Sequence, residues 1–356
     1  MASPVPLPLV FDGHNDALLR LWAWGDDAGA TFLDPQLPRP PERVPPDRYP
    51  GFPHDHLDLR RARAGGLAGG LFAAFVPHRA GRAPAQPEAL ATVLAQVAIL
   101  RRMVRASDGA IRQCRTANEI RIAMASGALA PVLHLEGADT IDADLHALET
   151  LHAAGLRSLG LVWNGANAFG HGAPFRPNAT NEDGAPGLSD AGIALVRACD
   201  ELGVLIDLSH LNAAGMRDVA RHSRRPLVAT HSNAHALSPT SRNLTDDQLR
   251  RIADTGGVVG LNFGTSFLRA DMRRDADTPL DAMRRHLDHL LGILGEDGVA
   301  LGSDFDGAPM PIAIGDASGT YRLLQALREA GWGDRPMEKL AGGNWLRVLG
   351  AAERPL

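Results

Sequence analysis

The chain has 356 residues, of which 45% are hydrophobic and 22% charged, a balance typical of a globular protein. The formal net charge is −5, and no long basic run exists, which argues against nucleic acid as a partner. Two cysteines, Cys114 and Cys199, are too few for a disulfide framework or for a zinc site built from cysteines alone. Because no apolar stretch reaches membrane-spanning length and the first nine residues lack a signal-peptide pattern, we expect a cytoplasmic protein without a membrane partner.

Apolar runs with the character of buried parallel strands alternate with helical patterns along the chain. The strand candidates cover residues 7–14, 66–76, 130–138, 156–164, 203–210, 226–232, 256–263 and 299–307. The helical patterns cover residues 89–106, 142–155, 189–203, 212–223, 245–256 and 280–295. Ser189, Asn212 and Thr245 suit helix N-caps, and Gly203 and Gly256 suit C-caps.

This alternation predicts an α/β fold, a (β/α)8 TIM barrel formed by one domain over residues 1–356. An open doubly wound sheet is the alternative, but it usually carries a glycine-rich phosphate loop where this chain has "DGHND". The glycines of residues 65–70 open a strand, so they predict a tight turn and close packing. The proline-rich segment 34–53 cannot be regular structure, and it forms either a loop over the catalytic face or a plain surface excursion.

Side chains that can bind metal follow five of the predicted strands, at the end where barrel active sites lie. They are His14 and Asp16 after the first strand, Glu136 after the third, His210 after the fifth, His231 after the sixth and Asp304 after the eighth. Taken alone, a histidine after an apolar run is more often a packed, hydrogen-bonded residue than a metal ligand, and a carboxylate after a strand is frequently a helix N-cap. Burying so many ionisable groups in one cavity is costly, however, unless a metal compensates for their lost hydration.

Imidazoles and carboxylates in this number suit a divalent ion, with zinc as the default. Five ligands exceed what one tetrahedral zinc needs, so the set predicts two Zn²⁺ ions with Glu136 able to bridge them. Two ions about 3.5–4 Å apart can hold a hydroxide and polarise a carbonyl, which is machinery for hydrolysis. Asp304 would then pass a proton from the attacking water to the leaving amine.

The sequence resembles the membrane dipeptidase (renal dipeptidase) family of zinc peptidases, within the amidohydrolase-like superfamily of metal-dependent hydrolase barrels. The matching motifs run in family order along nearly the whole chain: "DGHNDALL", "HLDLRRARAGGLAGGLFAAFV", "LHLEGAD", "LIDLSHLN", "ATHSNAHALSPTSRNLTDDQL", "GGVVGLNF", "LGSDFDG" and "GGNWLRVL". The resemblance implies that His14 and Asp16 bind one zinc, His210 and His231 bind the other, and Glu136 bridges them.

The resemblance also implies how substrate is bound. Asp304 matches the catalytic acidic residue of the family, which is placed to meet the amino end of the substrate. Arg242 matches an arginine that grips the free carboxylate, a contact suited to a planar guanidinium. Well-studied members carry a histidine after the fourth strand that contacts the scissile carbonyl oxygen, whereas this chain has Trp163 there, whose indole N–H carries no proton charge. Candidates for the missing donor are Asn164, Asn167 and His171.

The leading hypothesis is a dinuclear zinc dipeptidase that attacks the peptide bond with a metal-bound hydroxide. Its substrates would be dipeptides with a free C-terminal carboxylate, and the family often accepts a D-configured C-terminal residue. One rival is another small amide or lactone hydrolase of the superfamily, for which Trp163 is the hint. A second rival is a metal-binding barrel with a maturation role and no peptidase turnover. We expect a homodimer from the resemblance alone.

The remaining histidines are expected to have lesser roles. His134 lies two residues before Glu136, so strand alternation points both side chains to the same face, and His134 is a candidate for supporting the site. His54 and His56 lie beside the proline-rich segment, with the surface as the expected position and contact with the cavity as the alternative. His235, His286 and His289 are expected at the surface of helices or loops.

Overall fold

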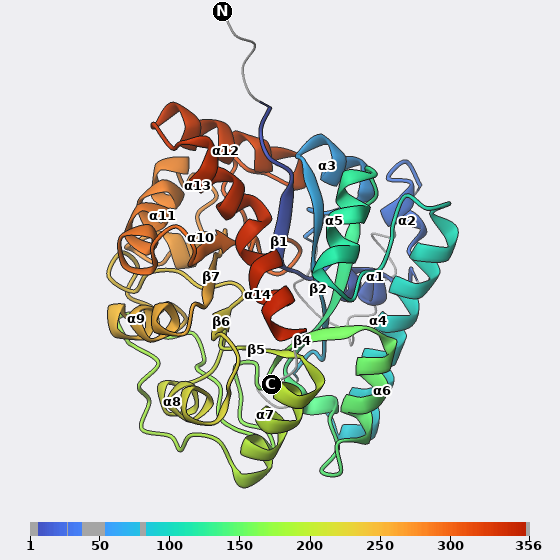
Figure 1. Ribbon diagram of the computed structural model, residues 1–356, viewed down its shortest axis with the longest axis vertical. Helices are drawn as coiled ribbons and strands as arrows, with labels where there is room; N and C mark the ends of the chain where they lie inside the picture. Colours follow the sequence, from blue (N-terminus) through green and yellow to red (C-terminus); the bar gives the residue numbers. More distant parts are fainter. Residues whose placement is uncertain (1–5, 27, 38–53, 79–82, 354–356) are drawn as a thin grey trace, which may run out of the picture.

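A computed structural model describes residues 6–26, 28–37, 54–78 and 83–353. Its centre is an eight-stranded parallel sheet in which each strand pairs with the next one along the chain (Figure 1). The strands are β1 (Val10–Asn15), β2 (Leu67–Phe75), β3 (Ala130–Glu136), β4 (Leu156–Gly160), β5 (Leu205–Asp207), β6 (Val228–Ala229), β7 (Val258–Leu261) and β8 (Val299–Leu301). The sheet closes because Asp304 N–H donates to the His14 carbonyl at 2.9 Å and Asp16 N–H donates to the Phe305 carbonyl at 2.8 Å. The predicted (β/α)8 barrel is therefore confirmed.

Helices surround the strands on the outside of the barrel (Figure 1). They are α1 (Ala17–Trp24), α2 (Ala30–Leu33), α3 (Leu59–Ala64), α4 (Gln86–Ala106), α5 (Ala117–Ala125), α6 (His146–Ala154), α7 (Asp190–Leu202), α8 (Ala213–His222), α9 (Asp246–Asp254), α10 (Thr265–Leu268), α11 (Leu280–Leu294), α12 (Thr320–Glu329), α13 (Asp334–Glu338) and α14 (Asn344–Ala352). Shorter helical turns are η1 (Ala138–Thr140), η2 (Ala317–Gly319) and η3 (Lys339–Gly343). The six helical patterns of the sequence correspond to α4, α6, α7, α8, α9 and α11.

Four of the five predicted helix caps are formed, and the fifth, Gly256, lies one residue away from the observed cap. The side chains of Ser189, Asn212 and Thr245 each accept a hydrogen bond from the main chain of the first turn of α7, α8 and α9. Gly203 ends α7 in the left-handed conformation, with a φ of 70°. Gly256 lies one residue beyond the C-cap of α9 and has a φ of 67°. These local signals place the helix ends correctly because caps depend on neighbours in sequence.

Several strands are shorter than predicted. Near the carboxyl end of the barrel, side-chain oxygens replace main-chain carbonyls as hydrogen-bond acceptors. Strand β6 contains only Val228 and Ala229. The next residue, Thr230, donates its N–H to Asp207 Oδ1 at 2.8 Å, where a neighbouring strand would otherwise offer a carbonyl. The chain thus leaves the sheet just before the residues predicted for the site.

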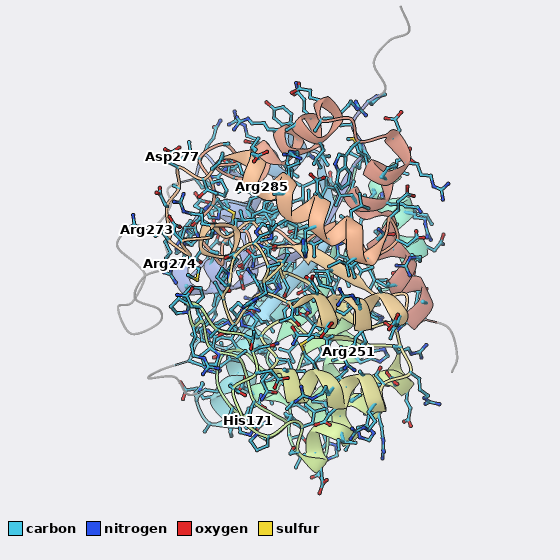
Figure 2. All side chains as sticks on the ribbon, turned by 90° about the vertical axis from the view of Figure 1, so that its left-hand side faces the viewer. His171, Arg251, Arg273, Arg274, Asp277 and Arg285 are labelled. Carbon is cyan, nitrogen blue, oxygen red and sulfur yellow. The ribbon has the colours of Figure 1, made fainter. Side chains whose placement is uncertain are left out.

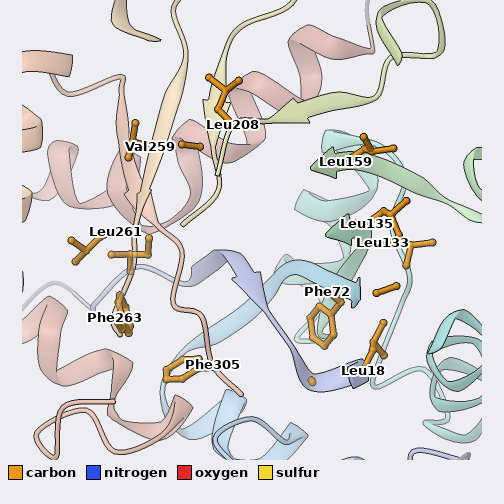
Figure 3. Packing of buried hydrophobic residues seen from close by; sticks show 14 of the residues in the cluster. Leu18, Phe72, Leu133, Leu135, Leu159, Leu208, Val259, Leu261, Phe263 and Phe305 are labelled. Carbon is orange, nitrogen blue, oxygen red and sulfur yellow. The ribbon is translucent and has the colours of Figure 1, made fainter. Parts of the chain in front are cut away.

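Two apolar layers hold the barrel. Leucines on the outer face of the strands pack against the helices, as Figure 3 shows for Leu133, Leu135 and Leu159. Inside the barrel, apolar strand residues pack against Trp345 of α14, whose indole N–H donates to the Leu301 carbonyl at 2.8 Å. A Cβ at Gly13 would lie 2.5 Å from the Trp345 ring, so this packing requires the glycine of "DGHND". The floor of the barrel is therefore apolar, and polar side chains gather at the other end.

Two further predictions concern segments outside the strands. A Cβ at Gly65 would lie 1.8 Å from the Ala317 carbonyl oxygen, which confirms close packing at the turn before β2. The proline-rich segment 34–53 falls mostly outside the described residues, which stop at 37 and resume at 54. None of the described helices combines the length and apolar composition needed to cross a membrane.

Candidate active site

A cavity of about 530 Å³ opens at the carboxyl ends of the strands, a size typical of small-molecule sites. Residues predicted for the site that line it are Asp16, Glu136, Trp163, Asn164, His210, His231, Arg242 and Asp304. The ninth predicted residue, His14, has a fully buried side chain in contact with Asp16 and Glu136. The fold thus brings together all nine residues, which come from strand ends and the loops that follow them, and the outermost two, His14 and Asp304, are 290 positions apart in the sequence.

Glu136, the last residue of β3, lies at the centre of the polar cluster. Its Oε1 atom is 3.0 Å from His210 Nε2, 3.6 Å from His231 Nε2 and 3.8 Å from His14 Nε2. On the far side, His14 Nε2 is 3.4 Å from Asp16 Oδ2. One carboxylate oxygen therefore lies between histidines that come from opposite sides of the barrel.

Hydrogen bonds on the outer side of two histidines decide where their lone pairs point. His210 Nδ1 lies 3.0 Å from Asn164 Oδ1, which can only accept. His231 Nδ1 lies 2.8 Å from Thr230 Oγ1, whose own hydrogen goes to Asp207 Oδ2 at 2.6 Å. Both rings consequently carry hydrogen on Nδ1, and burial holds the pKa of both well below the usual range. Their two Nε2 lone pairs face each other at 3.0 Å, an arrangement that a cation stabilises.

The opposite half of the cluster shows the same demand for positive charge. Neither ring nitrogen of His14, nor Asp16 Oδ1, finds a hydrogen-bond partner among the described residues. Burial works to lower the pKa of His14, but the carboxylates of Glu136, Asp16 and Asp304 outweigh it and raise the pKa to about 10. Burial also raises the pKa of Glu136 well above its usual range. Orphaned imidazole nitrogens beside buried carboxylates fit a bound metal, and this donor set is the one zinc takes.

Two overlapping groups of three side chains could each hold a metal ion, because within each group the potential ligand atoms lie within 4.8 Å of one another. One group is His14, Glu136 and His231, and the other is His14, Asp16 and Asp304.

Asp304 follows β8 with a left-handed φ of 62° that turns its side chain into the cavity. Burial raises its pKa to about 7, although the positive charge of His14 works against that shift. Asn262 Nδ2 donates to Asp304 Oδ2 at 2.9 Å. Asn262 was not predicted as a site residue, although a polar residue near the end of the otherwise apolar run 256–263 was an available signal.

Arg242 presents a guanidinium group to the cavity. The residue is 6% exposed, and its Nε finds no hydrogen-bond partner within the described part of the chain. The guanidinium carbon lies 5.7 Å from the centroid of the Phe267 ring. Burial lowers the pKa of Arg242, while Asp304 and Glu136 oppose that shift. A buried guanidinium whose Nε has no hydrogen-bond partner among the described residues is suited to binding an anion, because a buried charge is costly unless it is paired.

Trp163 lies in a group of aromatic rings that forms one wall of the cavity. The Trp163 ring centroid is 5.1 Å from that of Phe75, 5.2 Å from that of His78 and 5.9 Å from that of His210. Of the three candidates for a further donor, Asn164 lines the cavity. Asn167 instead binds the main chain of its own loop, through Leu161 and Phe169, and His171 is half-buried near the surface (Figure 2).

The other histidines follow the predictions only in part. His134 is fully buried with its ring 5.4 Å from that of His14, as the strand alternation predicts. His54 is half-buried and lines the cavity, which is the alternative to its expected surface position. The surface prediction is wrong for His286, which is 1% exposed on the inner face of α11. His286 accepts a hydrogen bond from Ala234 N–H and pairs with the Leu268 carbonyl oxygen.

A (β/α)8 barrel with imidazoles and carboxylates converging at the carboxyl ends of its strands is the architecture of a metal-dependent hydrolase. The chain belongs to the membrane dipeptidase family, peptidase family M19, whose family model matches residues 7–355. Members of this family are zinc-dependent hydrolases that act on peptide bonds, and this chain is one of them.

Similar proteins agree with this assignment. The chain is 50% identical over 258 residues to an uncharacterized protein from the pqqA 5′ region of Klebsiella pneumoniae, covering 71% of this chain and 93% of that protein. The structure of a dipeptidase called dipeptidase AC, of family M19, matches with a TM-score of 0.89 and 44% identity, over 98% of this chain and 99% of that one. A metallopeptidase from Rhodobacter sphaeroides, liganded with a phosphinate mimic of the dipeptide L-Ala-D-Ala, matches with a TM-score of 0.88 and 42% identity, over 98% of this chain and 100% of that one.

Proposed function

We propose that the protein is a dinuclear zinc dipeptidase that hydrolyses dipeptides with a free C-terminal carboxylate, including dipeptides with a D-configured C-terminal residue. The observation that carries this proposal is the convergence of five metal-type side chains on one cavity. The cavity also holds the guanidinium of Arg242, whose Nε has no hydrogen-bond partner in the described part of the chain. The similar Rhodobacter sphaeroides enzyme, which binds a mimic of L-Ala-D-Ala, supports acceptance of a D-residue.

In this proposal His14 and Asp16 hold one zinc, His210 and His231 hold the other, and Glu136 contacts both. The distances of Glu136 Oε1 from all three histidines support its bridging position. Five side chains are also more than the three or four protein ligands of a single zinc site. When bound, the ions lower the pKa of water and polarise the scissile carbonyl.

The side chains of the cavity perform the remaining steps. Arg242 binds the C-terminal carboxylate of the dipeptide through its guanidinium. Asp304 contacts the amino end, takes a proton from water as oxygen bonds to the carbonyl carbon, and gives that proton to the amine as the C–N bond breaks. Asn164 uses its oxygen for His210, so its Nδ2 hydrogens are the free donors for the carbonyl oxygen of the substrate. Trp163 supplies the apolar wall beside that carbonyl.

Metal analysis and a substrate screen test the proposal together. Protein purified without added metal is expected to contain two zinc ions per chain, and one or none would reject the dinuclear site. A zinc-supplemented screen of L–L, L–D and β-aspartyl dipeptides is expected to reveal turnover. Turnover of lactones or N-acyl amino acids without any dipeptide turnover would favour the rival amide or lactone hydrolase, for which Trp163 is the specific observation.

A substitution of the proton-transferring group separates binding from catalysis. Asp304→Asn is expected to keep both metals and to lower kcat about 10²–10⁴-fold, because the amide cannot carry the proton. The matched control Asp144→Asn, at an exposed position outside the cavity, is expected to leave kcat unchanged. Full activity of Asp304→Asn would remove Asp304 from its proposed role. A homodimer remains a prediction from family resemblance.

A further inference from the structure

Three buried asparagines lie behind the cavity, between Asp304 and Arg242. Asn233 follows β6, Asn243 is the neighbour of Arg242, and Asn262 follows β7. Their exposures are 0%, 1% and 1%, so water has little access to their amide groups. All three Nδ2 groups donate within the described part of the chain, whereas Asn243 Oδ1 finds no hydrogen-bond partner there. We call Asn233, Asn243 and Asn262 the asparagine network.

The orientation of the Asn262 amide follows from its neighbours. Its Oδ1 atom accepts the Gly264 N–H at 2.6 Å, so its Nδ2 must be the atom that faces Asp304 Oδ2 at 2.9 Å. Asn262 is in turn fixed by a reciprocal pair with Asn233. The Asn262 N–H donates to Asn233 Oδ1 at 2.9 Å, and Asn233 Nδ2 donates to the Asn262 carbonyl at 2.9 Å.

The same network supports Arg242 from below. Asn233 Nδ2 and Asn243 Nδ2 both donate to the carbonyl of Phe267, at 3.2 Å and 2.9 Å. The ring of Phe267 is the surface against which the Arg242 guanidinium lies, at 5.7 Å from the ring centroid. Each Nδ2 has only two hydrogens, and every one in Asn233 and Asn243 is used, because Asn243 also donates to the Ser238 carbonyl at 2.8 Å.

We propose that the asparagine network consists of positioning residues that fix Asp304 and Arg242 relative to each other. Asn262 occupies Asp304 Oδ2 with a donated hydrogen, which leaves Oδ1 as the oxygen available for proton transfer. Asp304 Oδ1 lies over Gly307 together with Asp16 Oδ2, since a Cβ at Gly307 would be 2.1 Å and 2.3 Å from these atoms. The inference rests on the proposed function, in which Arg242 and Asp304 meet opposite ends of one dipeptide, so a fixed separation selects substrates of two residues.

The decisive variant is Asn262→Asp, which keeps the shape and the acceptor for Gly264 N–H but turns a carboxylate oxygen toward Asp304. We expect kcat per zinc-loaded site to fall about 10–100-fold, with KM within about twofold of wild type. The solvent deuterium isotope effect on kcat should rise, because proton transfer then limits the rate. Asn243→Ala should instead raise KM about fivefold and leave the isotope effect unchanged, because it loosens the support of Arg242.

Asn344 provides a matched control. It is 1% exposed and donates to the Glu296 and Val299 carbonyls at 2.8 Å, at the other end of β8. Asn344→Asp should lower the melting temperature and leave kcat, KM and the isotope effect unchanged. The assay uses a dipeptide that the wild-type enzyme hydrolyses. If the proposed function is wrong, the wild type hydrolyses no dipeptide. If only the positioning role is wrong, the wild type is active and the Asn262 and Asn243 variants lack the expected changes.

Two results would overturn the inference. The first is an Asn262→Asp variant whose kcat stays within twofold of wild type, or falls without any change in the isotope effect. The second is loss of folding or of zinc in both Asn262→Asp and Asn262→Ala, since a positioning residue is dispensable for forming the barrel.

Discussion

Thr230→Val tests whether the environment behind a histidine controls the metal centre. The substitution keeps the size of the side chain and removes the hydroxyl that lies between His231 Nδ1, at 2.8 Å, and Asp207 Oδ2, at 2.6 Å. Thr230 is fully buried, and Asp207 and His231 are nearly so, at 1% and 2% exposed. Water therefore has little access to replace the lost hydroxyl.

The structure sets the expected magnitude. The variant loses one hydrogen bond to a neutral ring, worth about 1 kcal/mol, and one to a carboxylate, worth about 1.5–3 kcal/mol. We expect the free energy of unfolding of the metal-free protein to fall by about 2–4 kcal/mol. The His231 ring also loses the contact that keeps hydrogen on Nδ1, so zinc affinity should fall about 10–100-fold, or about 1.4–2.8 kcal/mol.

Competition with a chromophoric chelator, followed by elemental analysis, measures this loss. Thr230→Ser should restore wild-type zinc affinity because it keeps the hydroxyl. Thr140→Val is the matched control: Thr140 is fully buried, but its hydroxyl finds no hydrogen-bond partner among the described residues. Zinc affinity within twofold of wild type in Thr230→Val, or an equal loss in Thr140→Val, would contradict a role of the Thr230 hydroxyl in zinc binding.

Three further predictions address substrate binding, pH and metal. Arg242→Lys should raise KM at least about tenfold for a dipeptide, but not for the corresponding dipeptide amide. A lysine cannot bind a carboxylate through two parallel hydrogen bonds, and steady-state kinetics on both substrates measures the difference. Burial lowers the pKa of His286 from 6.5 to about 4, despite its bond to Leu268 and with added repulsion from His289 and Arg285. The stabilisation from the neutral ring is therefore fully present above pH 6.5, and about 2 kcal/mol of it is lost by pH 5. The free energy of unfolding in urea should accordingly depend less on pH for metal-free His286→Gln than for metal-free wild type. An equal dependence on pH in the two proteins would contradict this prediction. Removal of metal by a chelator should lower the melting temperature and abolish turnover, and added zinc should restore both; a melting temperature unchanged by the chelator would contradict a metal-stabilised centre.

Much of the candidate site was predictable because its residues occupy equivalent places on the strands. His14, Glu136 and His231 each end an apolar run, and the carboxyl ends of all strands in a barrel face the same way. Their approach in space therefore follows from the strand pattern alone. The same logic covers Asp304, whose loop joins β1 through main-chain hydrogen bonds from Asp304 to His14 and from Asp16 to Phe305.

Other features depend on contacts that no sequence period encodes. His286 lies on α11 at a position that also suits a solvent-facing residue, and burial against Ala234, 52 positions earlier, makes it a core residue. Asn262 is one polar residue after an apolar run, and its role follows from Asp304, 42 positions later. Local propensity contains no information about these partners.

The class of fold, the N-caps of α7, α8 and α9 and the six potential metal and proton-transfer side chains follow from local period, capping residues and strand direction. Which nitrogen of His210 and His231 faces the cavity, and which oxygen of Asp304 accepts from Asn262, depends on contacts between distant segments. Those choices are made by hydrogen bonds to Asn164, Thr230 and Asn262. Such bonds exist only after loops from different strands have closed over one another.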